Sequence, residues 1–288
     1  MKRFYFEPSS YCQLKCSLCP SKNFSASRRG DMDFNSFKKL IELTFDEGII
    51  SCGDDVHLYG FGEPTLNKRL EDMISLLSEK KITTKINTNG LTIVKKRWDS
   101  LKKSGLTKCL ISIDGLDQET YEKYRVGGDF DLLNKNVYYI CNNKNNIQIE
   151  LQFIAFSHNQ NQIDQFIEYS KRVNADIATI KKPRTWEGSI ENYSGLIGLK
   201  NNSVRNLEKK GCRFQDDYGV VLQDGSLTIC TADAFGKYVA GNIFQEGPKL
   251  WLSQKFRTIK HEARIKGLDI CKNCGYDDAY IKKLHLTK

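Results

Sequence analysis

Cysteine is the residue type whose spacing in this chain could do chemistry. Cys12, Cys16 and Cys19 stand in the stretch CQLKCSLCP with C-x3-C-x2-C spacing. A closed structural zinc site needs four ligands, and no further cysteine or histidine lies within the next thirty residues. Three thiolates with one position left open suit an iron–sulfur cluster that binds another molecule at its fourth iron. We therefore predict that these three cysteines hold iron.

A second set of four cysteines lies in the last third of the chain, with C-x17-C-x40-C-x2-C spacing. A hairpin expected in residues 218–230 would bring the first two together, and a C-x2-C pair is a common chelating arrangement. The spacing alone fits a structural zinc ribbon as well as an iron–sulfur cluster. The set consists of Cys212, Cys230, Cys271 and Cys274.

The composition indicates an ordinary globular protein. The chain has 288 residues, of which 40% are hydrophobic and 27% charged, and its formal net charge is +9. No apolar run is long enough to span a bilayer, and Glu7 and Pro8 interrupt the N-terminal apolar stretch too early for a signal peptide. We expect a cytoplasmic protein without membrane or nucleic-acid partners, whose cysteines serve metal binding or catalysis rather than disulfides.

Strand-like and helix-like segments alternate along the first two thirds of the chain. Strands are expected at 3–8, 55–62, 81–90, 107–115, 146–156 and 176–182, and helices at 33–48, 66–80, 93–105, 130–143 and 161–174. Asp33 is the expected N-cap of the first helix and Gly48 its stop. The apolar strands favour burial on both faces of a parallel sheet. This pattern predicts a partial (β/α)6 TIM-like barrel with the first cysteines at its C-terminal mouth, where active sites are built.

Four short motifs follow the expected strands in order. They are the three-cysteine motif, GFGEP at 60–64, NTNG at 87–90 and SIDG at 112–115. In this order they resemble the radical S-adenosylmethionine (SAM) enzymes, although Phe61 replaces the first glycine of the family's GGEP motif. Leu18 likewise stands where the family usually has an aromatic residue. The resemblance implies a [4Fe–4S] cluster on the first three cysteines, with SAM at its open iron.

The resemblance also implies which side chains lie around SAM. They are Glu63 of GFGEP, Asn89 of NTNG, Ser112 and Asp114 of SIDG, and Arg125 of YRVGGDF. The sequence around the second cysteine set resembles the short, or twitch, form of the family's auxiliary-cluster (SPASM) domain. That likeness implies a second [4Fe–4S] cluster ligated by all four cysteines. The expected domains are a barrel at 1–182, a linker at 183–211 and a small hairpin-and-helix twitch domain at 212–288.

The resemblance implies an oxidoreductase that forms a 5′-deoxyadenosyl radical and takes hydrogen from a small hydroxylated, sugar- or cyclitol-like substrate, phosphorylated or not. The auxiliary cluster would accept the substrate's electron, and a flavodoxin or ferredoxin would supply the reducing electron. The start of the chain at the first strand, without a leader-binding domain, favours a small substrate. Three alternatives stay open: modification of a peptide or protein, a redox-neutral epimerisation or elimination, and a zinc-binding interaction module without activity.

An oxidation also needs a proton acceptor and contacts to the substrate. By position, Glu187, His158 and Tyr193 are candidates for the base. Lys182 and Arg184, which follow the last expected barrel strand, are candidates for binding a phosphate or carboxylate.

Overall fold

The computed structural model describes residues 1–183, 218–271 and 280–286. Its strands are β1 Arg3–Phe6, β2 Asp55–Leu58, β3 Thr83–Thr88, β4 Lys108–Ser112, β5 Gln148–Ile154, β6 Ile177–Lys181, β7 Val220–Val221, β8 Ser226–Thr228, β9 Val239–Asn242 and β10 Tyr280–His285. Its α-helices are α1 Phe34–Asp46, α2 Leu70–Glu79, α3 Lys95–Lys103, α4 Gln118–Glu122, α5 Phe130–Asn142, α6 Ile163–Arg172, α7 Ile243–Glu246 and α8 Gln254–Ile265. None of the helices described is both long and apolar enough to cross a bilayer.

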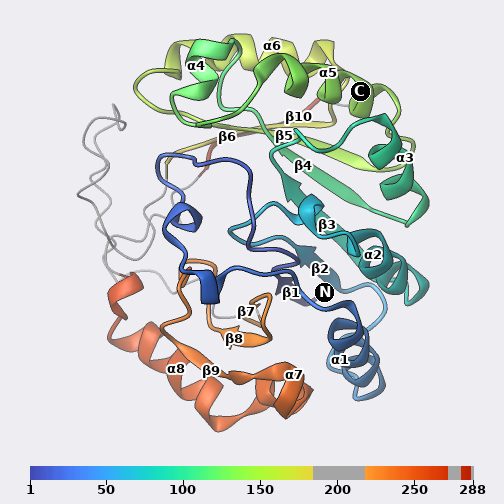
Figure 1. The fold of residues 1–288 in the computed structure, drawn as a ribbon, viewed down its shortest axis with the longest axis vertical. Coiled ribbons are helices and arrows are strands. Elements are labelled where there is room, and N and C mark those ends of the chain that lie inside the picture. Colours follow the sequence, from blue (N-terminus) through green and yellow to red (C-terminus); the bar gives the residue numbers. More distant parts are fainter. Residues whose placement is uncertain (184–217, 272–279, 287–288) are drawn as a thin grey trace.

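The first six strands form the parallel sheet that the alternating pattern predicts. Strands β1 to β6 pair in chain order, each parallel to the next, and helices α1, α2, α3, α5 and α6 lie along one side (Figure 1). Parallel pairing aligns the C-terminal ends of these strands at one edge, where the motif loops follow. The partial TIM-like barrel is confirmed.

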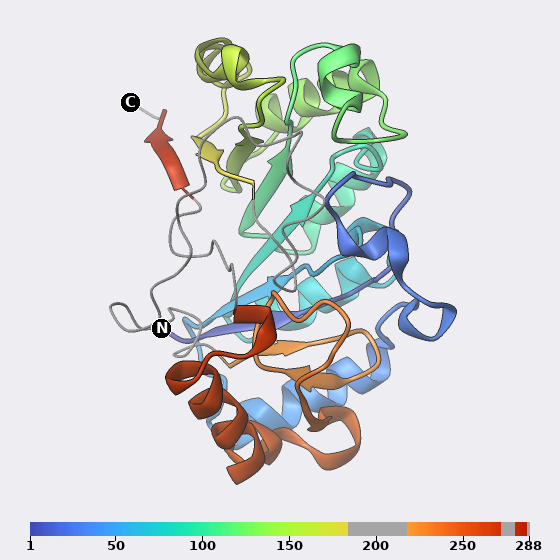
Figure 2. The same cartoon turned by 90° about the vertical axis from the view of Figure 1, so that its left-hand side faces the viewer.

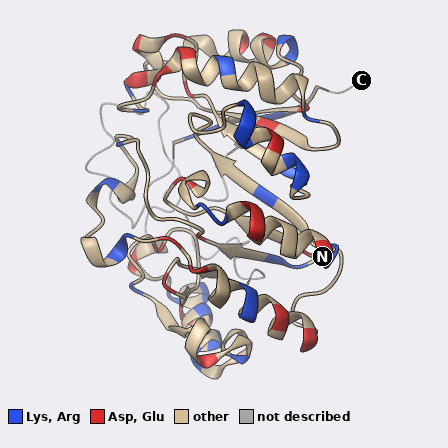
Figure 3. Cartoon of the chain, turned by 45° about the vertical axis from the view of Figure 1, so that its right-hand side comes forward, with Lys and Arg blue, Asp and Glu red and all other residues tan. Residues whose placement is uncertain are grey.

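Helix α1 begins and ends where the sequence predicts. The Asp33 carboxylate accepts a hydrogen bond from the Ser36 backbone N–H at 2.8 Å, which is N-cap geometry. The helix ends before Gly48, whose φ of +67° lies in the left-handed region that favours glycine. Along the outer helices, basic and acidic side chains are interspersed (Figure 3).

The two faces of the sheet differ. Strand residues are buried on both faces, as expected, but only the face toward the helices is mainly apolar. Phe4, Phe6, Val56 and Leu58 pack into the apolar core between sheet and helices. The alternate residues point to the concave face, as the two-residue period of a strand requires. That face carries many polar side chains: Asp55, His57, Lys85, Asn87, Ser112, Glu150, Gln152, Thr179 and Lys181.

The C-terminal part continues the same sheet. Strand β7 pairs in parallel with β1, and β8 and β9 follow antiparallel. The predicted hairpin is present, with Gly225 at φ +87° in its turn. At the other end of the sheet, β10 pairs antiparallel with β6 (Figure 2). The expected 183–211 linker lies outside the described residues apart from Pro183.

Several short elements escape sequence analysis. Helix α4, strand β9, helix α7 and strand β10 have between four and six residues each. Segments of this length carry too few residues to show a period. The helix of the expected hairpin-and-helix domain is a 3₁₀ turn at Pro248–Leu252 followed by α8, with Ser253 as its N-cap.

Candidate active site

The loop that carries the first three cysteines follows β1 and is fixed by backbone contacts. The Lys15 N–H donates to the Val126 carbonyl at 3.0 Å, and the Ser17 N–H donates to the Tyr124 carbonyl at 3.1 Å. The Cys19 N–H closes a turn by donating to the Cys16 carbonyl. The cysteine loop therefore rests on residues 124–126, more than a hundred residues away in sequence.

Gly62 of the GFGEP motif lets a second loop approach the cysteine loop closely. A Cβ atom at this position would lie 2.1 Å from the Ser9 carbonyl oxygen and 2.7 Å from the Ser10 backbone. Backbone cannot yield at such distances, so any side chain here would push the two loops apart. The glycine is needed for the approach, which places Glu63 beside the cysteines.

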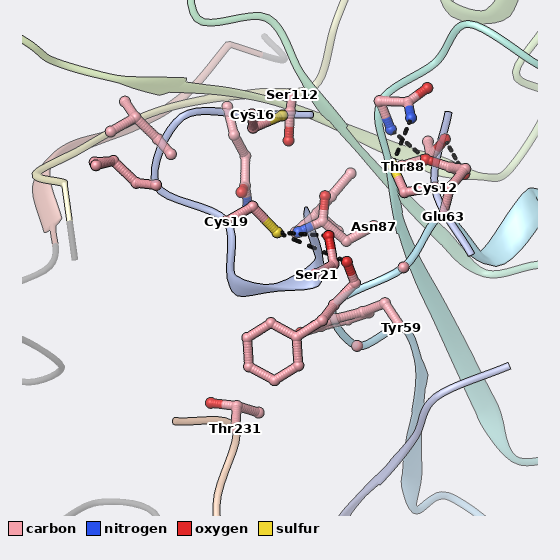
Figure 4. Close-up of a pocket in the computed structure, with 18 of the residues that line it drawn as sticks. Cys12, Cys16, Cys19, Ser21, Tyr59, Glu63, Asn87, Thr88, Ser112 and Thr231 are labelled. Carbon is pink, nitrogen blue, oxygen red and sulfur yellow. Dashed lines mark hydrogen bonds between the residues drawn. The ribbon is translucent and has the colours of Figure 1, made fainter. Parts of the chain in front are cut away.

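Cys12, Cys16 and Cys19 line one pocket of about 300 Å³ (Figure 4). In this view Cys19 lies beside Ser21, and Cys12 lies near Glu63 and Thr88. Burial raises the pKa of the Cys12 thiol to about 12 and also raises the pKa of the Cys16 thiol. Thiolates in this pocket therefore need a bound cation, and three soft sulfur donors fit an iron–sulfur cluster. In the described chain, no three His, Cys, Asp or Glu side chains surround a single-ion site.

Glu63 is buried in the pocket wall and both of its carboxylate oxygens are engaged. Oε2 accepts from the Asn89 N–H at 2.7 Å, and Oε1 accepts from the Thr88 hydroxyl at 2.7 Å. Burial raises the pKa of Glu63, while the bonds from Asn89 and Thr65 lower it. The structure thus joins GFGEP and NTNG through one carboxylate, which faces the pocket as the family resemblance implies.

Asn89 connects this carboxylate to the cysteine loop. Its side-chain oxygen accepts from Gln13 Nε2 at 3.1 Å, and its Nδ2 lies 3.9 Å from Cys12 Sγ. Asn89 lines the pocket and is only 5% exposed. It can position Cys12 and still offer polar atoms to a bound molecule.

Of the remaining expected SAM contacts, Ser112 and Arg125 line the pocket. Asp114 is fully buried behind them and has φ +55°. Its Oδ2 accepts from Arg125 Nε at 2.6 Å and its Oδ1 from the Ile154 N–H at 2.6 Å. Arg125 Nη1 lies 3.7 Å from Cys16 Sγ. Asp114 therefore holds Arg125 against the cysteine loop instead of lining the pocket itself.

The second cysteine set is described in part. Cys230 lines the same pocket as the first three cysteines, and its sulfur accepts from the Ala232 N–H at 3.1 Å. Cys271 is partly buried and packs against the main core. Cys212 and Cys274 lie outside the described residues. The soft sulfur donors of Cys230 and Cys271 suit an iron–sulfur cluster, as the first set does.

The candidates for the base and for anion binding differ in whether they line the pocket. His158 does not line the pocket: its ring stacks on Phe156 at 5.4 Å, and its Nε2 is buried without a partner in the described structure. This position does not favour His158 as the base. Lys182 does line the pocket. Arg184, Glu187 and Tyr193 lie outside the described residues.

Several concave-face side chains that also line the pocket were not among the expected site residues. They are Tyr5, Tyr59, Lys85, Asn87 and Gln152. Each lies on or directly after a parallel strand, in phase with the other inward residues of that strand. The signal was the alternation of polar and apolar residues in DVHLY and IELQF, with a shorter alternation around Ile86 in TTKINT.

Comparison with known proteins decides the family. A sequence profile of the radical SAM superfamily matches residues 6–169, more than half of the chain. The chain belongs to the radical SAM superfamily. A second profile, for the SPASM iron–sulfur cluster-binding domain, matches residues 212–275. The radical SAM enzyme accordingly uses SAM and two [4Fe–4S] clusters, which agrees with the sulfur donors at its pocket.

Relatives of this radical SAM enzyme differ in what they act on. The tungsten-containing aldehyde ferredoxin oxidoreductase cofactor-modifying protein of Pyrococcus furiosus is 22% identical, over 97% of this chain and 88% of the relative. The structure of BtrN with AdoMet and 2-DOIA has a TM-score of 0.64 at 19% identity, covering 95% of this chain and 92% of BtrN. The structure of anSMEcpe with AdoMet has a TM-score of 0.70 at 18% identity, covering 95% and 89%. At these identities the two structures show the fold alone.

Proposed function

We propose that this radical SAM enzyme oxidises a hydroxyl-bearing carbon of a small polar substrate, with the auxiliary cluster as electron acceptor. The observation that carries the proposal is one pocket bordered by both cysteine sets, with polar side chains between them. Cys12, Cys16 and Cys19 line it from the barrel, and Cys230 lines it from the C-terminal part. When bound, SAM and its cluster supply a 5′-deoxyadenosyl radical, the hydrogen-abstracting species of the family.

The polar floor of the pocket favours a small hydroxylated substrate. Asn87, Ser112 and Gln152 offer neutral donors and acceptors from three adjacent strands. Lys181 Nζ donates to Gln152 Oε1 at 2.8 Å, which orients that amide. Hydroxyl groups pair with such amides and hydroxyls, whereas an apolar side chain would leave them without partners.

The same pocket also favours a substrate that carries an anionic group. Lys85, Lys181 and Lys182 line it from β3 and from the end of β6. Burial lowers the pKa of Lys85, while Glu150 and Asp55 raise it. A phosphate or carboxylate beside these ammonium groups would favour their charged forms.

Cysteine variants test whether the first set serves SAM cleavage and the second set accepts the substrate's electron. Wild-type protein purified without oxygen should contain about eight irons per chain, and Cys19→Ala and Cys230→Ala should each lose about half. We expect Cys230→Ala to keep forming 5′-deoxyadenosine from SAM but to stop oxidising substrate. Cys19→Ala should lose both activities.

The exposed Cys52 provides the control, since Cys52→Ala should keep the full iron content and both activities. Iron analysis and chromatography of 5′-deoxyadenosine and of the oxidised product give the readouts. Wild-type rates of substrate oxidation in a Cys230→Ala protein that has lost half its iron would refute the proposed electron acceptor.

A further inference from the structure

Strand β2 places a chain of three polar side chains on the concave face. His57 Nε2 lies 2.8 Å from Asp55 Oδ2, and His57 Nδ1 lies 2.9 Å from the Tyr59 hydroxyl oxygen. The three residues alternate with Val56 and Leu58, which are buried in the core behind the sheet. The period of the strand therefore aligns a carboxylate, an imidazole and a phenol in one row.

The hydrogen bonds of this row determine which nitrogen of the His57 ring carries the hydrogen. Burial alone would raise the pKa of Asp55. The hydrogen bond and charge of His57 lower it by more, so the net effect is a lowered pKa. An ionised carboxylate can only accept, so His57 Nε2 carries the hydrogen. Burial lowers the pKa of His57 despite Asp55, so the ring is neutral at pH 7. Nδ1 then has a free lone pair and accepts the Tyr59 O–H.

Only the phenol end of the row reaches the pocket. Tyr59 lines it, together with Cys12, Cys19 and Cys230. Figure 4 shows Tyr59 in the same pocket as Cys12 and Cys19. His57 and Asp55 are 4% and 6% exposed and do not line the pocket. The ring of Tyr5 packs edge-on against His57 at 4.5 Å and keeps it in place. A proton taken up at Tyr59 can thus move inward to a site closed to water.

We propose that Tyr59 is the general base of the oxidation, with His57 and Asp55 as positioning residues behind it. This inference rests on the proposed function. As the substrate O–H bond breaks, its proton forms a new O–H bond on Tyr59, and the former Tyr59 proton moves to His57 Nδ1. The substrate's unpaired electron leaves to the one-electron acceptor, and a carbonyl group remains. The order of groups resembles a serine–histidine–aspartate triad, with a phenol in the serine position and with the partners of the two ring nitrogens exchanged.

The charges around His57 oppose its protonation except on one side. Arg3 of β1 and Lys85 of β3 disfavour the imidazolium, and Lys108 of β4 lowers the pKa of Asp55. Asp55 favours the imidazolium, and its Oδ1 is buried without a hydrogen-bond partner in the described structure. Among the described residues, the Asp55 carboxylate therefore makes its hydrogen bond to His57 alone. His57 can accept a proton during turnover but does not keep it at neutral pH.

The test removes one hydroxyl group. Tyr59→Phe should still transfer deuterium from a carbinol C–D bond to 5′-deoxyadenosine, but oxidised product should fall by about 10²-fold or more. The matched control is Tyr169→Phe, which removes a phenol on α6 that donates to Asn134 Oδ1 at 2.9 Å. This control should retain wild-type product formation. Iron content and 5′-deoxyadenosine formation verify that each variant is folded.

A second variant, at His57, tests whether this residue takes part in proton transfer from Tyr59 or only supports the structure. His57→Gln should lower product formation similarly, and the double variant should be no worse than either single one, because the groups act as a unit. The yield of product per 5′-deoxyadenosine should fall on acidification in wild type and be independent of pH in His57→Gln. Unchanged product in Tyr59→Phe, or additive losses in the double variant, would overturn the relay alone. Failure of wild type to take deuterium from any carbinol would overturn the proposed function and the relay together.

Discussion

His57 shows how burial of one side chain sets a property of the whole protein. Its pKa lies below that of an unfolded histidine because burial disfavours the charged ring. Between the two pKa values the unfolded state binds more protons, so the free energy of unfolding rises with pH. Asp55, whose pKa is also lowered, acts with the same sign in a more acidic range.

We therefore predict that His57→Gln weakens the loss of stability on acidification. The free energy of unfolding of wild type should fall between roughly pH 7 and pH 5, by at most about 1.4 kcal/mol per pH unit from this one proton. The variant should have a smaller slope, measured by anaerobic urea unfolding at several pH values. His261→Gln, on the exposed side of α8, serves as control. Equal slopes in wild type and His57→Gln would contradict the prediction.

At the scale of elements, Arg28 joins parts of the chain that are distant in sequence. Its Nη1 forms an ion pair with Glu7 Oε2 at 2.7 Å, and its Nε donates to the Ala234 carbonyl at 3.1 Å. Glu7 Oε1 also accepts from the Phe61 N–H at 3.0 Å, and Gln223 Nε2 donates to the Arg28 carbonyl at 3.1 Å. The Arg28 and Glu7 side chains are 10% and 0% exposed. This cluster holds β1, the GFGEP loop and the C-terminal hairpin together.

Arg28→Ala should therefore destabilise the protein by about 3–5 kcal/mol, because it removes the ion-pair partner of the buried Glu7 carboxylate. Lys171→Ala is the matched control, since its ion pair with Glu168 has a similar N–O distance of 2.8 Å but both side chains are exposed. That change should cost about 1 kcal/mol or less. Urea unfolding measures both values. A cost for Arg28→Ala no larger than that of Lys171→Ala would show that the cluster does not hold these elements together.

The elements that could be predicted are those with a sustained hydrophobic pattern or with a recognisable cap or turn residue. The helix capped by Asp33 and the hairpin turn at Gly225 follow from local chemistry, and so does the parallel order of six strands. Strand β10 could not be predicted, because its place beside β6 depends on pairing across the sheet. The alternation in β2, β3 and β5 indicates a polar concave face. The strand prediction instead relied on apolar residues such as Ile111 and Ile113, which both lie on the helix side of the sheet.

Some residues of the candidate site could also be predicted from the sequence, and others could not. The structure brings the motif residues Cys12, Cys16, Cys19, Glu63 and Asn89 to one pocket, because each follows a parallel strand at its C-terminal end. Neither Asp114 behind Arg125 nor His158 outside the pocket could be foreseen, since strand position does not fix which way a loop side chain turns. The row from Asp55 to Tyr59 depends on hydrogen bonds within one strand, which no linear motif marks.

For the molecule as a whole, one continuous sheet explains why both cysteine sets border one pocket. Strand β7 extends the barrel sheet at β1, and the segment after β8 carries Cys230 to the pocket. A substrate held there would lie between the site of hydrogen abstraction and the site that accepts the electron. In the proposed function, the pairing of β1 with β7 would therefore serve the reaction as well as the fold.

The central claim is that this pocket takes hydrogen from a carbon that bears a hydroxyl group. The most direct measurement incubates reduced wild-type enzyme and SAM with polyols, cyclitols and sugar phosphates deuterated at their carbinol positions. Mass spectrometry of 5′-deoxyadenosine then reports the transferred label. We predict deuterium in 5′-deoxyadenosine together with a ketone product three mass units lighter than the labelled substrate, because one deuterium and one hydrogen are lost. Label transferred only from a peptide, or from a position without a hydroxyl group, would contradict the account.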